Sequence, residues 1–276
     1  MCSKSAIIAF TKAHVAGNDF VIVCRRDLLA EVGTADLAQA ICANKTGIGG
    51  DQLLVLGRCE DDVDRVTLAI WNPDGTRSPF CGNACIACAA FISEDHPDVS
   101  RLQVDIDDQS YFLQRLDGSG PGNGWALQLP PPEEAYNLDS RKSDFFVRNG
   151  TVHRVVLGSL PQEPELVNTA LELSHEILAE EQTNVMFVSD IKGDRFAMRS
   201  WERGGTGLSL ACASGAAAAA WVLHATGRVG PRSSAHCAGG VLHIHIDNQG
   251  IQIGGHAAIT FTGKFFFDAM RTKRPC

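Results

Sequence analysis

Short runs of β-branched, aliphatic and aromatic residues recur along the first half of the chain and predict the strands of a sheet. Two helices are expected among these strands. The first begins at Thr34 and covers 34–44, and the second follows Cys81 in the segment 84–92. The expected strands lie at 6–13, 19–24, 52–57, 65–71, 102–106, 111–116 and 125–129.

Three consecutive prolines at 130–132 interrupt this pattern, since proline can continue neither a helix nor a central strand. After this linker candidate the same order of elements returns, with an amphipathic helix at 168–181 and an alanine-rich helix after Cys212. We therefore expect a weak internal duplication. The strands expected in this half lie at 145–149, 153–158, 184–190, 195–201, 241–246, 251–254 and 257–267.

The segment after Cys212 is apolar all round, which is typical of a helix buried on every side. The expected fold class is α/β, of the α+β type, with two similar halves that each wrap a curved, mainly antiparallel sheet around a central helix. The N-terminal half, 1–130, carries Cys81 and is joined by the C-terminal strand at about 264–276. The C-terminal half, 131–263, carries Cys212, and both helix starts are expected to face the cleft between the halves.

The charge and composition of the chain exclude several classes of partner. The formal net charge is −8 and the pI is about 5.6, which argue against a nucleic-acid-binding surface. No apolar stretch approaches the roughly 18–20 residues of a membrane-spanning helix, and the apolar run near the N-terminus is too short for a secretion signal. The ten cysteines fit no small disulfide scaffold. We expect a reduced, cytoplasmic protein with no nucleic-acid or membrane partner.

Cys81 and Cys212 each open a turn of small residues that leads into an expected helix. The start of a helix favours a thiolate, because its exposed N–H groups and its dipole lower a cysteine pKa. The same N–H groups bind anions, so two such turns are suited to holding a carboxylate between two thiols. An acid and a base on either side of an α-carbon exchange its proton. The residues alone also allow two small buried hydrophobic side chains before well-packed helices.

Five separated motifs resemble those of the diaminopimelate epimerases, which invert one α-carbon of diaminopimelate without a cofactor. They are FTKAHVAGNDF at 10–20, GIGGDQ at 47–52, WNPDG at 71–75 followed by CGN at 81–83, TNVMFV at 183–188, and WERG at 201–204 followed by ACASGA at 211–216. The resemblance covers essentially the whole chain. It implies a pyridoxal-phosphate-independent isomerase of lysine biosynthesis, in which one cysteine thiolate removes the α-proton and the other cysteine, as thiol, protonates the opposite face.

The resemblance implies that Cys81 and Cys212 are the catalytic acid and base, with Glu202 and His153 tuning their protonation. Backbone N–H groups of small residues at the helix starts are expected to bind the developing negative charge. Amides and a guanidinium suit a zwitterion, although asparagine is also typical of plain turns. The implied substrate-binding residues are Asn18, Gln52, Asn72, Gly82, Asn83, Asn184, Glu202, Arg203, Ala213 and Ser214. We expect no metal or other cofactor, a small amino-acid substrate, and a monomer or homodimer.

Four features depart from the family pattern. Thr151 replaces an amide expected near the far end of the substrate, Ile86 replaces an arginine, and Ala213 replaces a glycine. The segment GGTGLS at 204–209 is one residue longer than usual and lacks a second glutamate. None of these changes removes a thiol, so the reaction is expected to be intact while recognition of the distal end is open. Diaminopimelate is the leading substrate, and the alternative is a racemase of histidine or another basic amino acid.

Other classes of protein match single motifs. Cys81, Cys85 and Cys88 form a CxxxCxxC spacing, which in radical S-adenosylmethionine enzymes holds an iron–sulfur cluster. The helix expected there, and the lack of an alternating strand and helix series, favour the racemase. A relative that isomerises or eliminates with one acid–base group is a further alternative, which the presence of both thiols disfavours. His243 and His245 share one strand face, a pattern more typical of a solvated surface than of a metal site.

Overall fold

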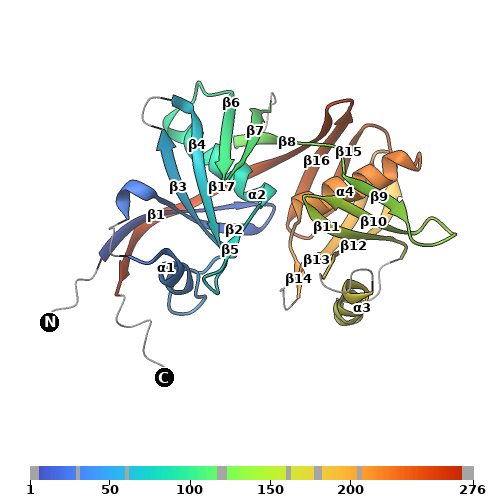
Figure 1. Cartoon of the computed structure of the whole chain (residues 1–276), viewed down its shortest axis with the longest axis horizontal. Coiled ribbons are helices and arrows are strands. Elements are labelled where there is room, and N and C mark those ends of the chain that lie inside the picture. Colours follow the sequence, from blue (N-terminus) through green and yellow to red (C-terminus); the bar gives the residue numbers. More distant parts are fainter. Residues whose placement is uncertain are drawn as a thin grey trace. The chain divides into compact units, whose positions relative to one another are not determined.

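The chain divides into two units in the computed structural model (Figure 1). Unit 1 comprises residues 1–15, 19–125 and 256–276, and unit 2 comprises residues 16–18 and 126–255. Strands and helices mix in both units, so the fold is of the predicted α+β type. The structure describes residues 6–28, 32–59, 62–116, 123–159, 163–176, 182–203 and 207–268.

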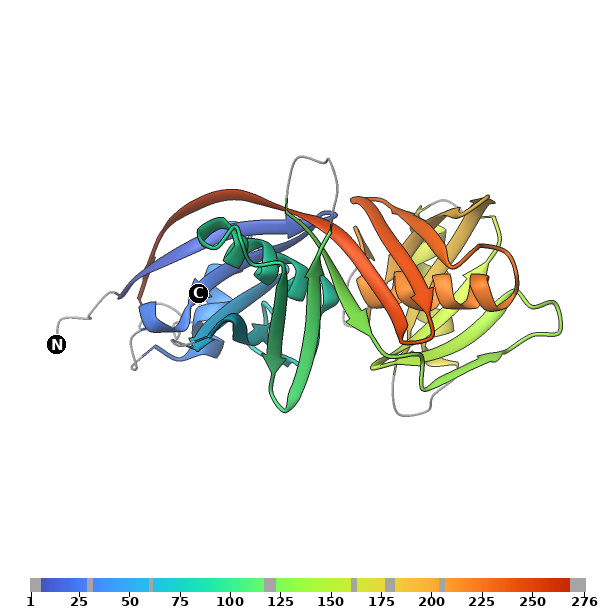
Figure 2. The same cartoon turned by 90° about the horizontal axis from the view of Figure 1, so that it is seen from above.

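Unit 1 holds the first elements of the chain and the end of its last strand. In chain order its elements are β1 Ala6–Val15, β2 Asn18–Cys24, a short 3-10 helix Arg25–Asp27, α1 Thr34–Ile41, β3 Gln52–Cys59, β4 Asp62–Trp71, β5 Arg77–Ser78, α2 Gly82–Asp95, β6 Arg101–Ile106, β7 Gln109–Arg115 and the start of β8 Asn123–Leu129. The last strand, β17 Gly250–Phe267, pairs antiparallel with β1 from Ala257 onward, and the two ribbons run side by side in Figure 2.

Unit 2 contains the remaining strands and the second pair of helices. In chain order these are β9 Glu134–Asn137, β10 Asp144–Asn149, β11 Thr151–Leu157, α3 Glu163–His175, β12 Asn184–Lys192, β13 Arg195–Trp201, β14 Leu208–Ser209, α4 Ala213–Ala225, β15 Arg232–Cys237 and β16 Gly240–Asp247. The first part of β17 pairs antiparallel with β16.

The two units repeat one strand topology. In unit 1, β2 pairs parallel with β3, β3 antiparallel with β4, β4 parallel with β6, and β6 antiparallel with β7. In unit 2, β11, β12, β13, β15 and β16 pair in the same sequence of directions. In both units one helix precedes the second of these strands, and a two-residue strand followed by a second helix precedes the fourth. The expected internal duplication is therefore confirmed at the level of topology.

The two alanine-rich helices are buried in the centres of their units. Every residue in 84–90 of α2 and in 216–220 of α4 has an exposed fraction of 0%. Strands β10, β11, β12, β15 and β16 all contact α4, so its small side chains let the sheet approach on several sides. Gly215 leaves room for one such contact, because a Cβ there would lie 2.2 Å from Sδ of Met186 on β12 and would displace that side chain. The predicted central helices are confirmed.

Several boundaries differ from the expected ones. The chain changes unit inside β8, between Trp125 and Ala126, and the prolines 130–132 lie between β8 and β9 within unit 2. It returns to unit 1 at His256, upstream of the return expected at about 264. The amphipathic helix of the second half begins at Glu163, and 177–181 lie outside the described residues. Among the described residues, no helix is both long enough and apolar enough to span a membrane.

Candidate active site

Cys81 and Cys212 occupy equivalent positions in the duplicated topology. Cys81 directly precedes α2, and Cys212 directly precedes α4. Both residues have extended backbone conformations, with φ and ψ of −151° and 114° at Cys81 and of −127° and 110° at Cys212. The first N–H groups of each helix have no partner within the helix itself and are suited to binding anions. Each unit therefore presents one thiol beside a potential anion-binding turn.

The Cys212 thiol is held in its protonated form by its surroundings. Cys212 is buried, and its Sγ lies 3.6 Å from Oγ of Ser214. Burial raises the pKa of the thiol well above its usual value, and the negative charge of Glu202 raises it further, while the contact with Ser214 lowers it. These causes act against the lowering of a cysteine pKa that the start of a helix favours.

His153 lies at the centre of unit 2 as a neutral imidazole. The side chain is fully buried on β11, and its Nε2 is 2.7 Å from Oγ1 of Thr151. Burial lowers the pKa of His153 to about 3, and the positive charge of Arg203 acts in the same direction. The ring is therefore uncharged at neutral pH. It can accept or donate a single hydrogen bond at each nitrogen, but it does not carry positive charge.

Asn184 connects His153 to the segment that carries Glu202 and Arg203. His153 and Asn184 are register partners in the parallel pair β11 and β12. The backbone N–H of Arg203 donates to Oδ1 of Asn184 at 3.0 Å, and Asn184 is buried. Five residues that the sequence predicted for the site therefore meet in unit 2: His153, Asn184, Glu202, Arg203 and, through its interaction with Glu202, Cys212. The side-chain amide of Asn184 orders the segment after β13.

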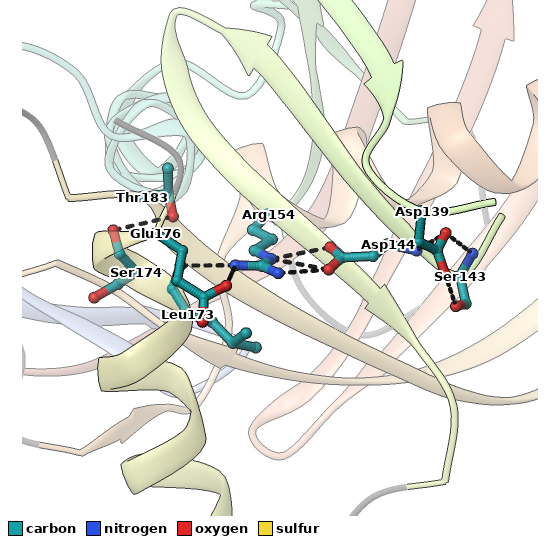
Figure 3. A network of polar contacts seen from close by, with 8 residues as sticks. All are labelled: Asp139, Ser143, Asp144, Arg154, Leu173, Ser174, Glu176 and Thr183. Carbon is teal, nitrogen blue, oxygen red and sulfur yellow. Dashed lines mark hydrogen bonds and ion pairs between the residues drawn. The ribbon is translucent and has the colours of Figure 1, made fainter. Parts of the chain in front are cut away.

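An ion-pair network fixes the opposite face of β11 (Figure 3). The guanidinium of Arg154 contacts the carboxylate of Asp144 at distances down to 2.6 Å, that of Glu176 at 2.7 Å, and the carbonyl oxygen of Leu173 at 3.1 Å. These contacts join β10, β11 and the end of α3. Successive strand residues point to opposite faces, so the network anchors the strand while His153 points to the other side.

Two predicted substrate-binding amides meet in unit 1. Nε2 of Gln52, at the start of β3, donates to Oδ1 of Asn72, just after β4, at 3.1 Å. Nδ2 of Asn72 in turn donates to Oγ1 of Thr76 at 3.0 Å. Thr76, which follows the NPDG turn, was not among the predicted residues and supports Asn72 from the turn. Both amides are therefore held by a chain of hydrogen bonds, and Asn72 is also part of the turn.

The remaining predicted residues lie at chain turns and helix starts. Asn18 follows a turn in which Ala16 and Gly17 have φ of 48° and 84°, and this turn belongs to unit 2 with Cys212. Gly82, Asn83 and Ala213 are buried in the first turns of α2 and α4, and Ser214 is partly exposed. Ile86 is fully buried inside α2, so the family departure at this position lies in the core of unit 1.

The described residues give no support to a metal centre. Cys85 and Cys88 are fully buried within α2, and burial raises the pKa of both thiols. In the described part of the chain, no group of three or more histidine, cysteine, aspartate or glutamate side chains is arranged to hold a metal ion. This applies to the CxxxCxxC segment and equally to His243 and His245 on β16.

Comparisons with known proteins agree with the resemblance in the motifs. Residues 10–109 match the family model described as diaminopimelate epimerase. A protein named diaminopimelate epimerase from Rickettsia akari (strain Hartford) is 28% identical over 275 residues, covering 95% of this chain and 98% of the relative. These coverages extend the similarity beyond the N-terminal half and through the Cys212 segment.

Solved structures of epimerases share the fold. A predicted epimerase from Pseudomonas aeruginosa matches with a TM-score of 0.73 at 14% identity, covering 95% of this chain and 100% of that one. A hydroxyproline epimerase from Agrobacterium vitis, with bound trans-4-hydroxy-L-proline, matches with a TM-score of 0.71 at 15% identity, covering 95% and 93%. At these identities the likeness concerns the fold. The partial family match, the full-length relatives and this shared fold together support an isomerase of the epimerase class that is similar to the diaminopimelate epimerases.

Proposed function

We propose that the protein is a diaminopimelate epimerase of lysine biosynthesis in the cytoplasm, interconverting LL- and meso-diaminopimelate with Cys81 and Cys212 as its acid and base. The observation that carries the proposal is the full-length similarity to named diaminopimelate epimerases, in a chain that keeps both cysteines at equivalent helix starts. Thr151 departs from the family pattern, so the substrate is the first property to test.

The proposed mechanism assigns the resting proton to Cys212. Its pKa is raised by burial and by Glu202, so it begins as the thiol that donates a proton. Cys81, as thiolate, takes the α-proton of the substrate and becomes a thiol. Cys212 gives its proton to the opposite face of the same carbon and becomes the thiolate. The reverse reaction exchanges the two roles, and no redox step or cofactor is required.

The carbanionic intermediate needs hydrogen-bond donors that are already in place. Removing an α-proton spreads negative charge onto the substrate carboxylate, and one well-placed donor of this kind contributes roughly 3 kcal/mol. The N–H groups of Gly82 and Asn83 and those of Ala213 and Ser214 are the donors we assign. Cys212 and His153 are both buried, so this part of the site is shielded from bulk water.

Deuterium incorporation tests both the reaction and the substrate. Purified protein is incubated in deuterated water with LL-diaminopimelate and, separately, with individual L-amino acids including L-histidine. We expect α-deuterium and the meso isomer with diaminopimelate. Exchange with histidine or another basic amino acid, and none with diaminopimelate, would show the alternative racemase.

Single cysteine substitutions distinguish two-base from one-base chemistry. Cys81→Ala and Cys212→Ala should each abolish epimerisation, since each removes the acid or base on one face. An enzyme with one acid–base group should keep its activity in one of the two variants. Cys88→Ala serves as the matched control, because Cys88 is a buried thiol of α2 outside the proposed site.

A further inference from the structure

Thr151 and His153 form the side-chain pair at the start of β11. Oγ1 of Thr151 lies 2.7 Å from Nε2 of His153. His153 is fully buried, whereas Thr151 is partly exposed. The other ring nitrogen, Nδ1, is also buried and has no hydrogen-bond partner among the described residues. The two ring nitrogens therefore have different surroundings.

These surroundings select one tautomer of the neutral ring. One nitrogen carries the proton and the other is an acceptor. A proton on Nδ1 would leave a buried N–H donor without an acceptor, and buried donors without partners are rarer in proteins than acceptors without partners. A proton on Nε2 is satisfied by Oγ1 of Thr151. The pair is therefore expected as Nε2–H donating to Oγ1.

The direction of this hydrogen bond decides what Thr151 can offer a ligand. A hydroxyl has one proton and two lone pairs. If Oγ1 accepts from His153, the hydroxyl proton is left to donate elsewhere. In the opposite tautomer the hydroxyl proton would point at Nε2, and Thr151 could only accept. His153 thus determines whether the partly exposed hydroxyl of Thr151 can donate a hydrogen bond to a ligand or only accept one.

The charge that acts on His153 favours an anionic acceptor for this proton. The positive charge of Arg203 lowers the pKa of His153, so the pair feels a neighbouring cation. A carboxylate accepts hydrogen bonds only and is attracted by that cation. A substrate ammonium is disfavoured here, because it is itself a hydrogen-bond donor and a cation and would face another donor and another positive charge.

We propose that Thr151 is a specificity-determining residue that donates a hydrogen bond to a carboxylate of the substrate, with its hydroxyl oriented by Nε2–H of His153. This inference rests on the proposed function for the identity of the ligand. It also explains how threonine can stand where the family pattern has an amide: the hydroxyl supplies the donor, and the histidine prevents it from acting as an acceptor alone.

Nitrogen NMR of the full-length protein tests the tautomer without any ligand. With ¹⁵N-labelled histidine, the wild-type His153 ring should show the Nε2–H form, assigned by the loss of its signals in His153→Gln. Thr151→Ser should keep this form. In Thr151→Val the Nε2–H form should no longer be the main tautomer of the His153 ring. An Nδ1–H ring in the wild type, or an unchanged Nε2–H ring in Thr151→Val, would overturn the proposal.

Kinetics with LL-diaminopimelate test the donor role. Thr151→Val should raise KM about tenfold or more while kcat changes less, and Thr151→Ser should stay within about threefold of the wild type. An unchanged KM in Thr151→Val would refute the carboxylate contact while leaving the proposed function intact. If the wild type does not act on diaminopimelate at all, the proposed function fails, and the NMR result still decides the orientation of the pair.

Discussion

The ring of Tyr111 on β7 stacks on the ring of Phe80, the residue directly before Cys81, with centroids 4.7 Å apart and planes inclined by 26°. This contact couples the turn that carries the thiol to a distant strand of unit 1. The hydroxyl of Ser78 donates to the carbonyl oxygen of Phe80 at 3.2 Å and holds the same turn from within. The position of Cys81 therefore depends on an aromatic pair as well as on its helix.

Removing the stack should disturb the Cys81 thiol. In Tyr111→Ala we expect the rate of Cys81 alkylation by iodoacetamide, followed by mass spectrometry, to change by up to about tenfold, because an aromatic pair contributes about 0.5–1.5 kcal/mol. Tyr111→Phe keeps the ring and should behave as the wild type. Equal alkylation rates in Tyr111→Ala and the wild type would show that the stack does not position the thiol.

Glu202 should control the reactivity of Cys212. A nearby carboxylate repels a thiolate and raises the thiol pKa, so Glu202→Gln should lower that pKa and increase alkylation of Cys212 at a given pH. The measurement is the pH dependence of Cys212 labelling by mass spectrometry. Buried Cys88, whose pKa is raised mainly by desolvation, is the internal reference and should not respond. If the pH dependence of Cys212 labelling is the same in Glu202→Gln and the wild type, Glu202 does not control the pKa of Cys212.

The Arg154 network should contribute strongly to the stability of unit 2. Arg154 is 7% exposed, and Arg154→Met would leave the carboxylate of Asp144 without its partner. Breaking such a buried pair costs about 3 kcal/mol in the free energy of unfolding. Glu176→Gln is the control, because Glu176 is 56% exposed and exposed pairs contribute less than about 1 kcal/mol. Urea unfolding of both variants measures the difference, and equal losses would contradict this account.

Gly239 should be required for the turn that leads to Asn18. A Cβ at Gly239 would lie 1.9 Å from the carbonyl oxygen of Ala16, so Gly239→Ala forces the turn to move. We expect a loss of about 1–3 kcal/mol in the free energy of unfolding and a raised KM for the substrate. Gly158→Ala is the matched control, since nothing lies within 4 Å of its Cβ. Wild-type stability and KM in Gly239→Ala would contradict the prediction.

Burial of His153 predicts a loss of stability in acid. Its pKa is about 3 in the folded protein and 6.5 without the fold, so the unfolded chain binds more protons between these values. Above pH 6.5 the ring is neutral in both states and does not affect stability. As the pH drops from 6.5 toward 3, the free energy of unfolding falls by up to about 1.4 kcal/mol per pH unit. Urea unfolding at pH 7, 6 and 5 should show that the free energy of unfolding falls less steeply with decreasing pH in His153→Gln than in the wild type. Identical slopes would mean that another group causes the acid sensitivity.

The sequence by itself determined the order and type of most elements. Strands appear where β-branched and aromatic residues gather, and α2 and α4 begin directly after Cys81 and Cys212, as their small-residue turns predict. These signals are local, because a backbone conformation depends on a few neighbouring residues and on the period of the apolar side chains. Apolarity on all sides also predicted correctly that both helices lie at the centre of a unit.

Tertiary structure decided the chemistry of individual side chains. The turn before α4 locally favours a thiolate, whereas burial and the charge of Glu202 raise the pKa of Cys212. In the sequence pattern Thr151 only replaces an expected amide, whereas in the fold it is the hydrogen-bond partner of His153. The stack of Tyr111 on Phe80 has no counterpart in the local pattern. Desolvation and side-chain contacts arise between residues far apart in the chain, so only their arrangement in space determines them.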